Sequence, residues 1–159
     1  MTRNTLIFLV AAAMAALVVA GCGGGGNQAT AASTQSGGGS KTINVTDNGD
    51  LGRILTDSKG RTIYLFEKDT NHRSACYGQC ATYWPPLLTT AKPVAGTGVK
   101  KALLGTIRRS NGKKQVTYNG HPLSRYIQDP RPGQITGQDS HFFGAAWYVV
   151  SPSGKKIGD

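Results

Sequence analysis

The feature that most constrains the fold is a pair of Asn-Gly dipeptides, Asn111-Gly112 and Asn119-Gly120, within residues 105–126. Asn-Gly between short β-rich runs strongly indicates a β-hairpin, because both turn residues are expected to take positive φ. Two such turns in succession predict a three-stranded antiparallel meander.

Two further segments also have the pattern of hairpins. Residues 52–66 contain a strand, an Asp57-Ser58-Lys59-Gly60 turn and a second strand. Residues 146–158 contain another pair of short β-rich runs around Ser153-Gly154. Gly and Asn punctuate such runs because they tolerate the backbone angles that tight turns require. Hairpins are therefore predicted in three segments of the chain.

The expected fold class is mainly β, with antiparallel hairpins and a meander in one domain spanning residues 41–159. That length is sufficient for a single hydrophobic core. A helical period is only weak, so we expect at most a short helical turn near Cys76–Tyr83.

The segment Ile63–Phe66 predicts a central strand. Alternate strand residues share a face, so Tyr64 and Phe66 point one way while Ile63 and Leu65 point the other. Because both faces are apolar, the strand should be covered on both sides. Asp69 follows the end of this strand, where a carboxylate can accept hydrogen bonds from backbone N–H groups in a turn.

The chain also repeats itself. The heptapeptide IYLFEKD at residues 63–69 aligns with LSRYIQD at residues 123–129, and a tryptophan follows each by about twenty positions. Duplicated supersecondary units produce this kind of self-similarity. We therefore predict two degenerate repeat units, at about residues 50–90 and 103–154, with Ser124 standing where the first copy has Tyr64.

These residues resemble a family of bacterial predicted lipoproteins described as secreted repeats of unknown function. That family is marked by a Tyr-x-aromatic-x-x-Asp motif, which Tyr64, Phe66 and Asp69 match. The resemblance covers nearly all of residues 50–154 and implies no established activity. The family residues, to which we assign a structural role, are Tyr64, Phe66, Asp69 and Trp84 in the first copy, and Tyr126, Asp129 and Trp147 in the second.

A functional alternative exists for the two aspartates of the repeats. Asp69 and Asp129 could form a catalytic carboxylate pair of the glycosidase kind. The sequence does not fix the separation of the two carboxylates, so we favour a structural corner for each of them.

Residues 1–21 have the organisation of a signal peptide. Arg3 precedes an apolar run of residues 6–20, whose helical length of about 22 Å falls short of the ~30 Å hydrocarbon core of a bilayer. The alternative is a short transmembrane anchor. LVVAGC at residues 17–22 resembles the lipobox of bacterial lipoproteins, which implies that Cys22 carries the lipid and becomes the new N-terminus.

The segment that follows Cys22 predicts a flexible tether. Residues 23–40 contain no aromatic and no charged side chain, so they cannot bury enough apolar surface to fold. With lipidated Cys22, this tether would hold the domain at the cell membrane or outer envelope, on the extracytoplasmic face.

The two remaining cysteines, Cys76 and Cys80, are expected to form a disulfide. Their number is even once Cys22 is lipidated, and the compartment is oxidising. On a helical turn their Cα atoms would lie about 6 Å apart, within the span of a disulfide. The alternative is an envelope redox or copper-handling protein that uses the two thiolates with an imidazole from His72, His121 or His141.

No catalytic constellation accompanies these motifs. The chain has no nucleophile elbow, P-loop or dinucleotide fingerprint, and no histidine pair at a metal-ligand spacing. His121 is most simply an exposed hairpin residue. We therefore expect no enzyme, no cofactor and no metal, and a binding or structural role at the envelope.

Net charge gives the last clue to partners. The chain carries a formal charge of +10, and its basic residues gather at Lys100, Lys101, Arg108, Arg109, Lys113, Lys114, Lys155 and Lys156. Outside the cytoplasm nucleic acid is not an expected partner, whereas anionic lipid and acidic wall polymers are. The alternative is that these side chains are solvated residues on turns and edge strands.

Overall fold

The computed structural model describes residues 39–70 and 72–158. The predicted signal peptide, Cys22 and all but the last two residues of the predicted tether lie outside this part of the chain. Within it, no helix has both the length and the apolar character needed to cross a membrane.

Short strands dominate the described residues, as the sequence predicts. The strands are β1 (Thr42–Asp47), β2 (Arg53–Asp57), β3 (Tyr64–Phe66), β4 (Leu88–Thr89), β5 (Val94–Ala95), β6 (Leu104–Arg108), β7 (Lys114–Tyr118), β8 (His121–Pro122) and β9 (Trp147–Val149). The short helix α1 (Gln79–Tyr83) falls where the helical turn is expected, and a 3-10 helix at Lys101–Leu103 is an addition.

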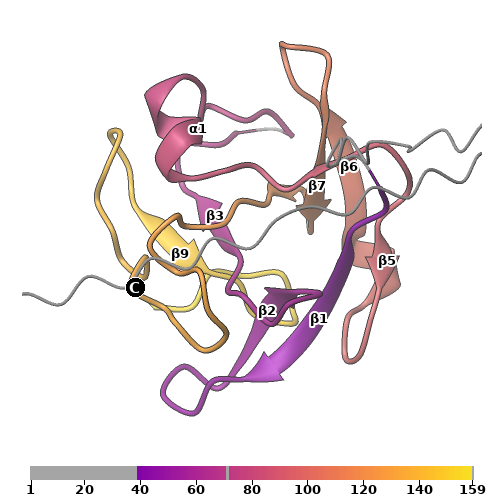
Figure 1. The fold of residues 1–159 in the computed structure, drawn as a ribbon, viewed down its shortest axis with the longest axis vertical. Coiled ribbons are helices and arrows are strands. Elements are labelled where there is room, and N and C mark those ends of the chain that lie inside the picture. The colour runs from indigo at the N-terminus through magenta and orange to yellow at the C-terminus, as the bar shows by residue number, and fades with distance from the viewer. Residues whose placement is uncertain (1–38, 71, 159) are drawn as a thin grey trace, which may run out of the picture. The chain divides into compact units, whose positions relative to one another are not determined.

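The strands form three small sheets. One has the order β2-β1-β5, one pairs β3 with β9, and one has the order β4-β7-β6 with β8 also paired to β7. All pairings are antiparallel except that of β1 with β5. The mainly β, antiparallel fold class is confirmed, with this one parallel pair as an exception. Figure 1 shows β3 near the middle of the domain, with β9 beside it.

The predicted meander is present as β6, β7 and β8. Asn119 and Gly120, at φ 49° and 82°, both have the positive φ expected of an Asn-Gly turn. The other dipeptide differs, because only Gly112 has positive φ, at 78°. The Arg109 N–H bonds to the Lys113 carbonyl, which makes a longer turn with one extra residue. The expectation of positive φ at both residues was therefore wrong for Asn111.

The predicted hairpin at residues 52–66 forms only in part. Its turn closes, since the Gly60 N–H donates to the Asp57 carbonyl over 2.9 Å. Beyond the single bridge between Thr56 and Thr62, the second strand leaves the first. It pairs with β9 instead, in the register Tyr64 to Val149. A strand buried on both faces needs neighbours that no local turn supplies.

Both faces of β3 are covered, as predicted. Ile63 and Leu65 pack in one hydrophobic cluster, and Tyr64 and Phe66 pack in the other. Burying side chains of this size contributes about 1.5–3 kcal/mol each. This strand therefore joins the two halves of the core.

The two repeats meet at equivalent positions. The Tyr64 N–H donates to the Ser124 carbonyl over 2.9 Å, and the Ser124 N–H donates to the Tyr64 carbonyl over 3.0 Å. Since Ser124 is the counterpart of Tyr64 in the second copy, this reciprocal pair relates the repeats by an approximate two-fold axis.

The aromatic residues of the repeats form a stack of four rings at the same place. Phe66 lies on Trp147 with ring centroids 4.2 Å apart, the two tryptophans stack at 4.0 Å, and Trp84 lies on Tyr126 at 4.2 Å. Phe66 and Tyr126 are counterparts, and each stacks on the tryptophan of the other repeat. The repeats are therefore interlocked through this four-ring stack.

Candidate functional site

The cysteine pair holds the start of α1. A disulfide joins Cys76 to Cys80, and the two residues are only 2% and 6% exposed. In this oxidised state neither sulfur is a thiolate ligand, and attack by another thiol requires access that burial denies. Within residues 39–70 and 72–158, no three His, Cys, Asp or Glu side chains are arranged to hold a metal ion. The geometry is that of a structural clip.

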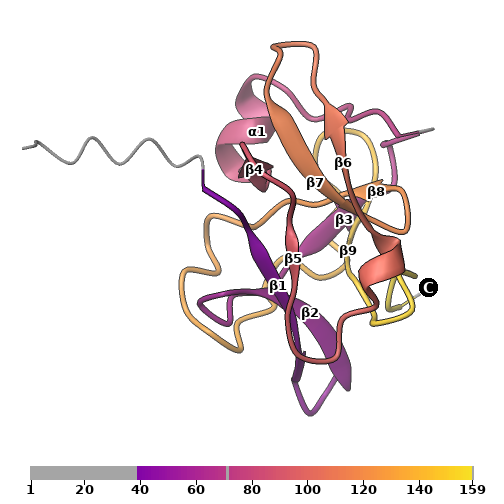
Figure 2. The same ribbon diagram turned by 90° about the vertical axis from the view of Figure 1, so that its right-hand side faces the viewer.

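The turn between β6 and β7 lies against this clip. The Ser110 N–H donates to the Tyr77 hydroxyl over 3.1 Å, and the Arg109 guanidinium packs 4.3 Å from the centre of the Tyr77 ring. Figures 1 and 2 both show α1 and the tip of the β6–β7 hairpin at the same end of the domain. Helix α1 is thus braced by a distant hairpin as well as by the disulfide.

The first tyrosine of the motif binds the second aspartate. The Tyr64 hydroxyl donates to Asp129 Oδ2, while the N–H and hydroxyl of Thr136 donate to Asp129 Oδ1. Asp129 is only 2% exposed. Burial, followed by the hydrogen bond with Asp129, raises the pKa of Tyr64 above its ordinary value. The carboxylate ties the two repeats together, and it is not available to substrate.

The first aspartate of the motif has different surroundings. Asp69 Oδ1 accepts the Ala75 N–H over 2.6 Å, so the carboxylate holds the turn after β3 in the way the sequence predicts. Its counterpart tyrosine is missing, because Ser124 occupies that position. Burial raises the pKa of Asp69 to about 6, and the nearby charge of Arg109 opposes this shift. The two aspartates have separate partners, which does not favour a catalytic pair.

A polar network fills the place of the missing tyrosine. Gln115 Nε2 donates to the Ser124 hydroxyl over 3.4 Å, and Gln115 Oε1 accepts a hydrogen bond from Arg109. Arg109 also donates to the Ser74 hydroxyl over 3.0 Å and to the Cys76 carbonyl. This arginine is only 4% exposed, so its assignment to a basic surface cluster was wrong.

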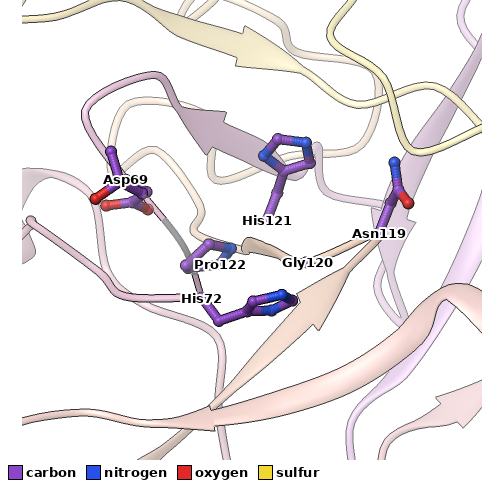
Figure 3. A pocket seen from close by; sticks show the side chains of 7 residues that line it. Asp69, His72, Asn119, Gly120, His121 and Pro122 are labelled. Carbon is purple, nitrogen blue, oxygen red and sulfur yellow. The ribbon is translucent and has the colours of Figure 1, made fainter.

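A polar pocket of about 200 Å3 lies beside Asp69. The residues that line it are Asp69, Thr70, His72, Asn119, Gly120, His121 and Pro122. In Figure 3, His72 and His121 come from different segments, with Gly120 and Pro122 between them in this view. Burial, and then the neighbouring His72, lower the pKa of His121. His121 is half-buried and is not the freely exposed hairpin residue that the sequence suggested.

The polar pocket adjoins a hollow of about 420 Å3 at the Phe66 end of the four-ring stack. Asp69, Asn119 and His121 line both spaces. The hollow also has charged residues in its lining, including Glu67 and Lys156, which form an ion pair of 2.8 Å with each other. This end of the stack is therefore bordered by charged as well as apolar side chains.

Replacing Asp69 with asparagine should change stability in a pH-dependent way, and the change should be more favourable at neutral pH than at pH 4. The pKa of Asp69 in the folded state, about 6, lies above the ordinary value near 3.9. The stability that protonated Asp69 contributes is full below pH ~4 and is lost as pH rises through ~6. We expect Asp69→Asn to raise the free energy of unfolding by about 1–2 kcal/mol at pH 7.5 relative to its effect at pH 4. Thermal unfolding across this range measures the difference, and a pH-independent difference would contradict the expectation.

The other end of the stack opens onto an aromatic pocket of about 310 Å3. Its lining consists of Gln79, Tyr83, Trp84, Tyr126, Gln128, Phe142 and Phe143. Tyr83 is 43% exposed and Phe142 is 59% exposed, and both are among the largest apolar side chains left at the described surface. Such a cluster of exposed rings around a concavity is typical of a binding site.

Comparison with protein-family models places the repeats in a known group. Residues 45–88 and 105–151 match the family described as secreted repeat of unknown function. The chain belongs to this family. The two matched segments confirm the two-repeat organisation, and membership makes this secreted repeat an extracytoplasmic protein. No curated protein and no solved structure matches it.

The secreted repeat places most of its motif residues in the core. Tyr64, Phe66, Trp84, Tyr126, Asp129 and Trp147 meet at the contact between the repeats. Sequence reasoning missed the other residues of the aromatic pocket, which are Gln79, Tyr83, Gln128, Phe142 and Phe143. The adjacent phenylalanines in a polar loop were the one available sign, because contiguous apolar surface often marks a binding site.

Proposed function

We propose that this secreted repeat is a lipid-anchored, non-enzymatic domain that binds a ligand at the cell envelope through the aromatic pocket. The anchor rests on the lipobox resemblance that ends at Cys22 and on the low-complexity tether that follows. The family description supports the extracytoplasmic location.

The observation that carries the binding role is the exposure of aromatic rings around the pocket. Burying an exposed ring against solvent-accessible apolar surface contributes about 25 cal/mol per Å2, so two rings left in water represent a substantial unused free energy. Tyr83 and Phe142 lie on α1 and on a distant loop, and yet both face one concavity. A ligand seated there would cover both rings.

The remaining basic residues suggest how the domain is held against the envelope. Lys100, Lys101, Arg108, Lys113, Lys114, Lys155 and Lys156 are exposed. A basic residue near an anionic surface contributes about 1 kcal/mol of attraction. We propose anionic lipid or an acidic wall polymer as the partner of these side chains, separate from the ligand of the aromatic pocket, and we expect no nucleic acid.

The anchor is tested by replacing Cys22 with serine. Serine cannot accept the thioether-linked lipid, so the variant should be released from the membrane fraction or mislocalised, and the lipid mass should vanish from its N-terminus. Cell fractionation and intact-mass analysis measure both effects, with Cys76→Ser as a matched control that keeps the anchor. A Cys22→Ser protein that stays in the membrane with its leader uncut would favour the transmembrane anchor instead.

A further inference from the structure

The lining of the aromatic pocket restricts the charge of its ligand. Among the described residues, those that form this pocket are five aromatic side chains and two primary amides, and none of them is charged. An ionised ligand would lose its hydration without gaining a counter-charge, which is unfavourable. The overall charge of +10 also repels cationic ligands. These include the quaternary ammonium groups that aromatic cages bind. The ligand is therefore neutral.

The two amides restrict the ligand further. Gln79 and Gln128 each offer two N–H donors and a carbonyl acceptor, and the Tyr83 and Tyr126 hydroxyls both donate and accept. A hydrocarbon or a plain aromatic ring could cover the aromatic side chains but would leave these polar groups without partners. A ligand with apolar faces and hydroxyl or acetamido groups at its edge would satisfy both sets.

We infer that the aromatic pocket binds a neutral saccharide chain of the cell envelope. A pyranose ring has C–H groups on its faces, which suit the negative face of an aromatic ring, and hydroxyls around its edge, which suit the amides. This inference rests on the proposed binding function and names its ligand class. The pocket volume is at the lower end for small-molecule sites, which suits one or two sugar rings.

Several independent supports fix the lining groups in place. Gln79 and Tyr83 are four residues apart in α1 and therefore lie on one face of the helix, whose start is held by the Cys76–Cys80 disulfide. Trp84 and Tyr126 are stacked on each other at 4.2 Å as part of the four-ring stack. Holding a binding surface in its bound geometry reduces the entropy lost on association.

The loop that carries the two phenylalanines is held in a costly conformation. Phe143 has φ 66°, in the left-handed region that large side chains rarely adopt, and Gly144 follows with φ 88°. Such a backbone conformation is unfavourable and persists where the surrounding structure holds it. Phe143 lies beside Tyr83 with ring centroids 6.1 Å apart, while Phe142 projects into solvent. The strain thus shapes the rim of the pocket.

Two envelope sources could supply a neutral saccharide, and two probes distinguish them. Chitotriose represents chains of N-acetylated hexosamines, as in wall glycan, and maltotriose represents chains of plain hexoses. Menadione, a neutral planar quinone without hydroxyl groups, represents the alternative ligand class. Binding to protein produced from the full-length sequence is measured by tryptophan fluorescence and by calorimetry, because Trp84 lines the pocket.

We expect one of the two saccharides to bind, and we expect substitutions in the aromatic pocket to weaken that binding. Phe142→Ala and Tyr83→Ala should each weaken saccharide binding about tenfold, through loss of a stacked ring. Gln128→Ala should weaken saccharide binding by about three- to tenfold and leave menadione unaffected. Val94→Ala is the matched control, because Val94 is exposed and lies outside the pocket, and its affinity should be unchanged.

The experiment gives different results if only the saccharide inference is wrong and if the proposed binding function is wrong as well. Menadione binding that depends on Tyr83, with neither saccharide bound, would overturn the saccharide inference and leave the binding pocket standing. If no probe bound, both would be overturned. Saccharide binding that survives Phe142→Ala and Tyr83→Ala would place the site elsewhere and overturn the assignment to this pocket.

Discussion

Replacing Trp147 with alanine is expected to lower the free energy of unfolding by about 3–5 kcal/mol. The Trp147 ring lies between Phe66 and Trp84, at centroid distances of 4.2 and 4.0 Å, and the residue is 1% exposed. Its removal would leave a cavity at the contact between the repeats. The free energy of unfolding of a domain of this size is only about 5–15 kcal/mol. The midpoint of thermal unfolding should therefore fall by roughly 12–20 °C.

The matched control is Phe142→Ala, which removes an aromatic ring that is 59% exposed. Substitution at such a surface position should change the free energy of unfolding by no more than about 0.5 kcal/mol. Near-UV circular dichroism during thermal unfolding follows both variants. If Trp147→Ala does not fold, Trp147→Phe keeps one ring of the stack and should give an intermediate loss. Equal effects of Trp147→Ala and Phe142→Ala would show that the four-ring stack does not hold the repeats together.

The local part of this fold was accessible from the sequence because tight turns have local causes. Asn119-Gly120, Gly60 and Gly154 each close a turn at the predicted position, with the glycines at positive φ. The run of consecutive apolar residues likewise predicted that β3 would be covered on both faces. These features depend on neighbours within a few residues, so composition and spacing are enough to find them.

The pairing of β3 with β9 and of β1 with β5 was not accessible in the same way. Strands far apart in the chain pair according to tertiary packing, and short strands contain too few residues to specify a distant register. The predicted hairpin at residues 52–66 shows the consequence. Its turn is at the predicted position, but the second strand takes its hydrogen-bond partner from β9, which lies far away in the sequence.

Only part of the candidate site was predicted from the sequence, for a similar reason. The motif residues were identified, but their partners depend on contacts that spacing does not reveal. Arg109 appeared to belong to a basic surface, and its burial follows only from the positions of Ser74 and Gln115. His72 and His121 lie far apart in the sequence and meet only because the turn at Gly120 faces the His72 segment.

The two repeats have diverged in the groups that surround their equivalent aspartates, Asp69 and Asp129. In one case a tyrosine hydroxyl reaches across to Asp129. In the other, Ser124 is too short, and Gln115 with Arg109 occupies the interior near Asp69. One solution is a set of neutral hydrogen-bond donors around a carboxylate in the core, and the other is a charged network that adjoins the polar pocket. The approximate symmetry thus produces one structural corner and one corner whose charge responds to pH.

Removing the Tyr64 hydroxyl should destabilise the protein more than removing a buried hydroxyl that has only neutral partners. Tyr64→Phe should lower the free energy of unfolding by about 1.5–3 kcal/mol, because the buried Asp129 carboxylate loses a hydrogen-bond donor. Tyr118→Phe is the matched control. The Tyr118 hydroxyl is also in the interior, but its partners are neutral, the Lys100 N–H and the Pro152 carbonyl, each at 3.0 Å. We expect Tyr118→Phe to lower the free energy of unfolding by about 0.5–1.5 kcal/mol.

A double-mutant cycle with Asp129→Asn isolates the bond between the repeats. If the Tyr64 hydroxyl acts through Asp129, its removal should matter much less once the carboxylate has been replaced, with a coupling energy of about 1–3 kcal/mol. Urea unfolding of the four proteins gives the free energies, and unchanged m-values would show that the unfolded states are comparable. Effects that add within about 0.5 kcal/mol would mean that the two residues stabilise the fold independently. The motif would then be explained by the packing of its aromatic rings alone, since the hydroxyl and carboxylate would have no joint role.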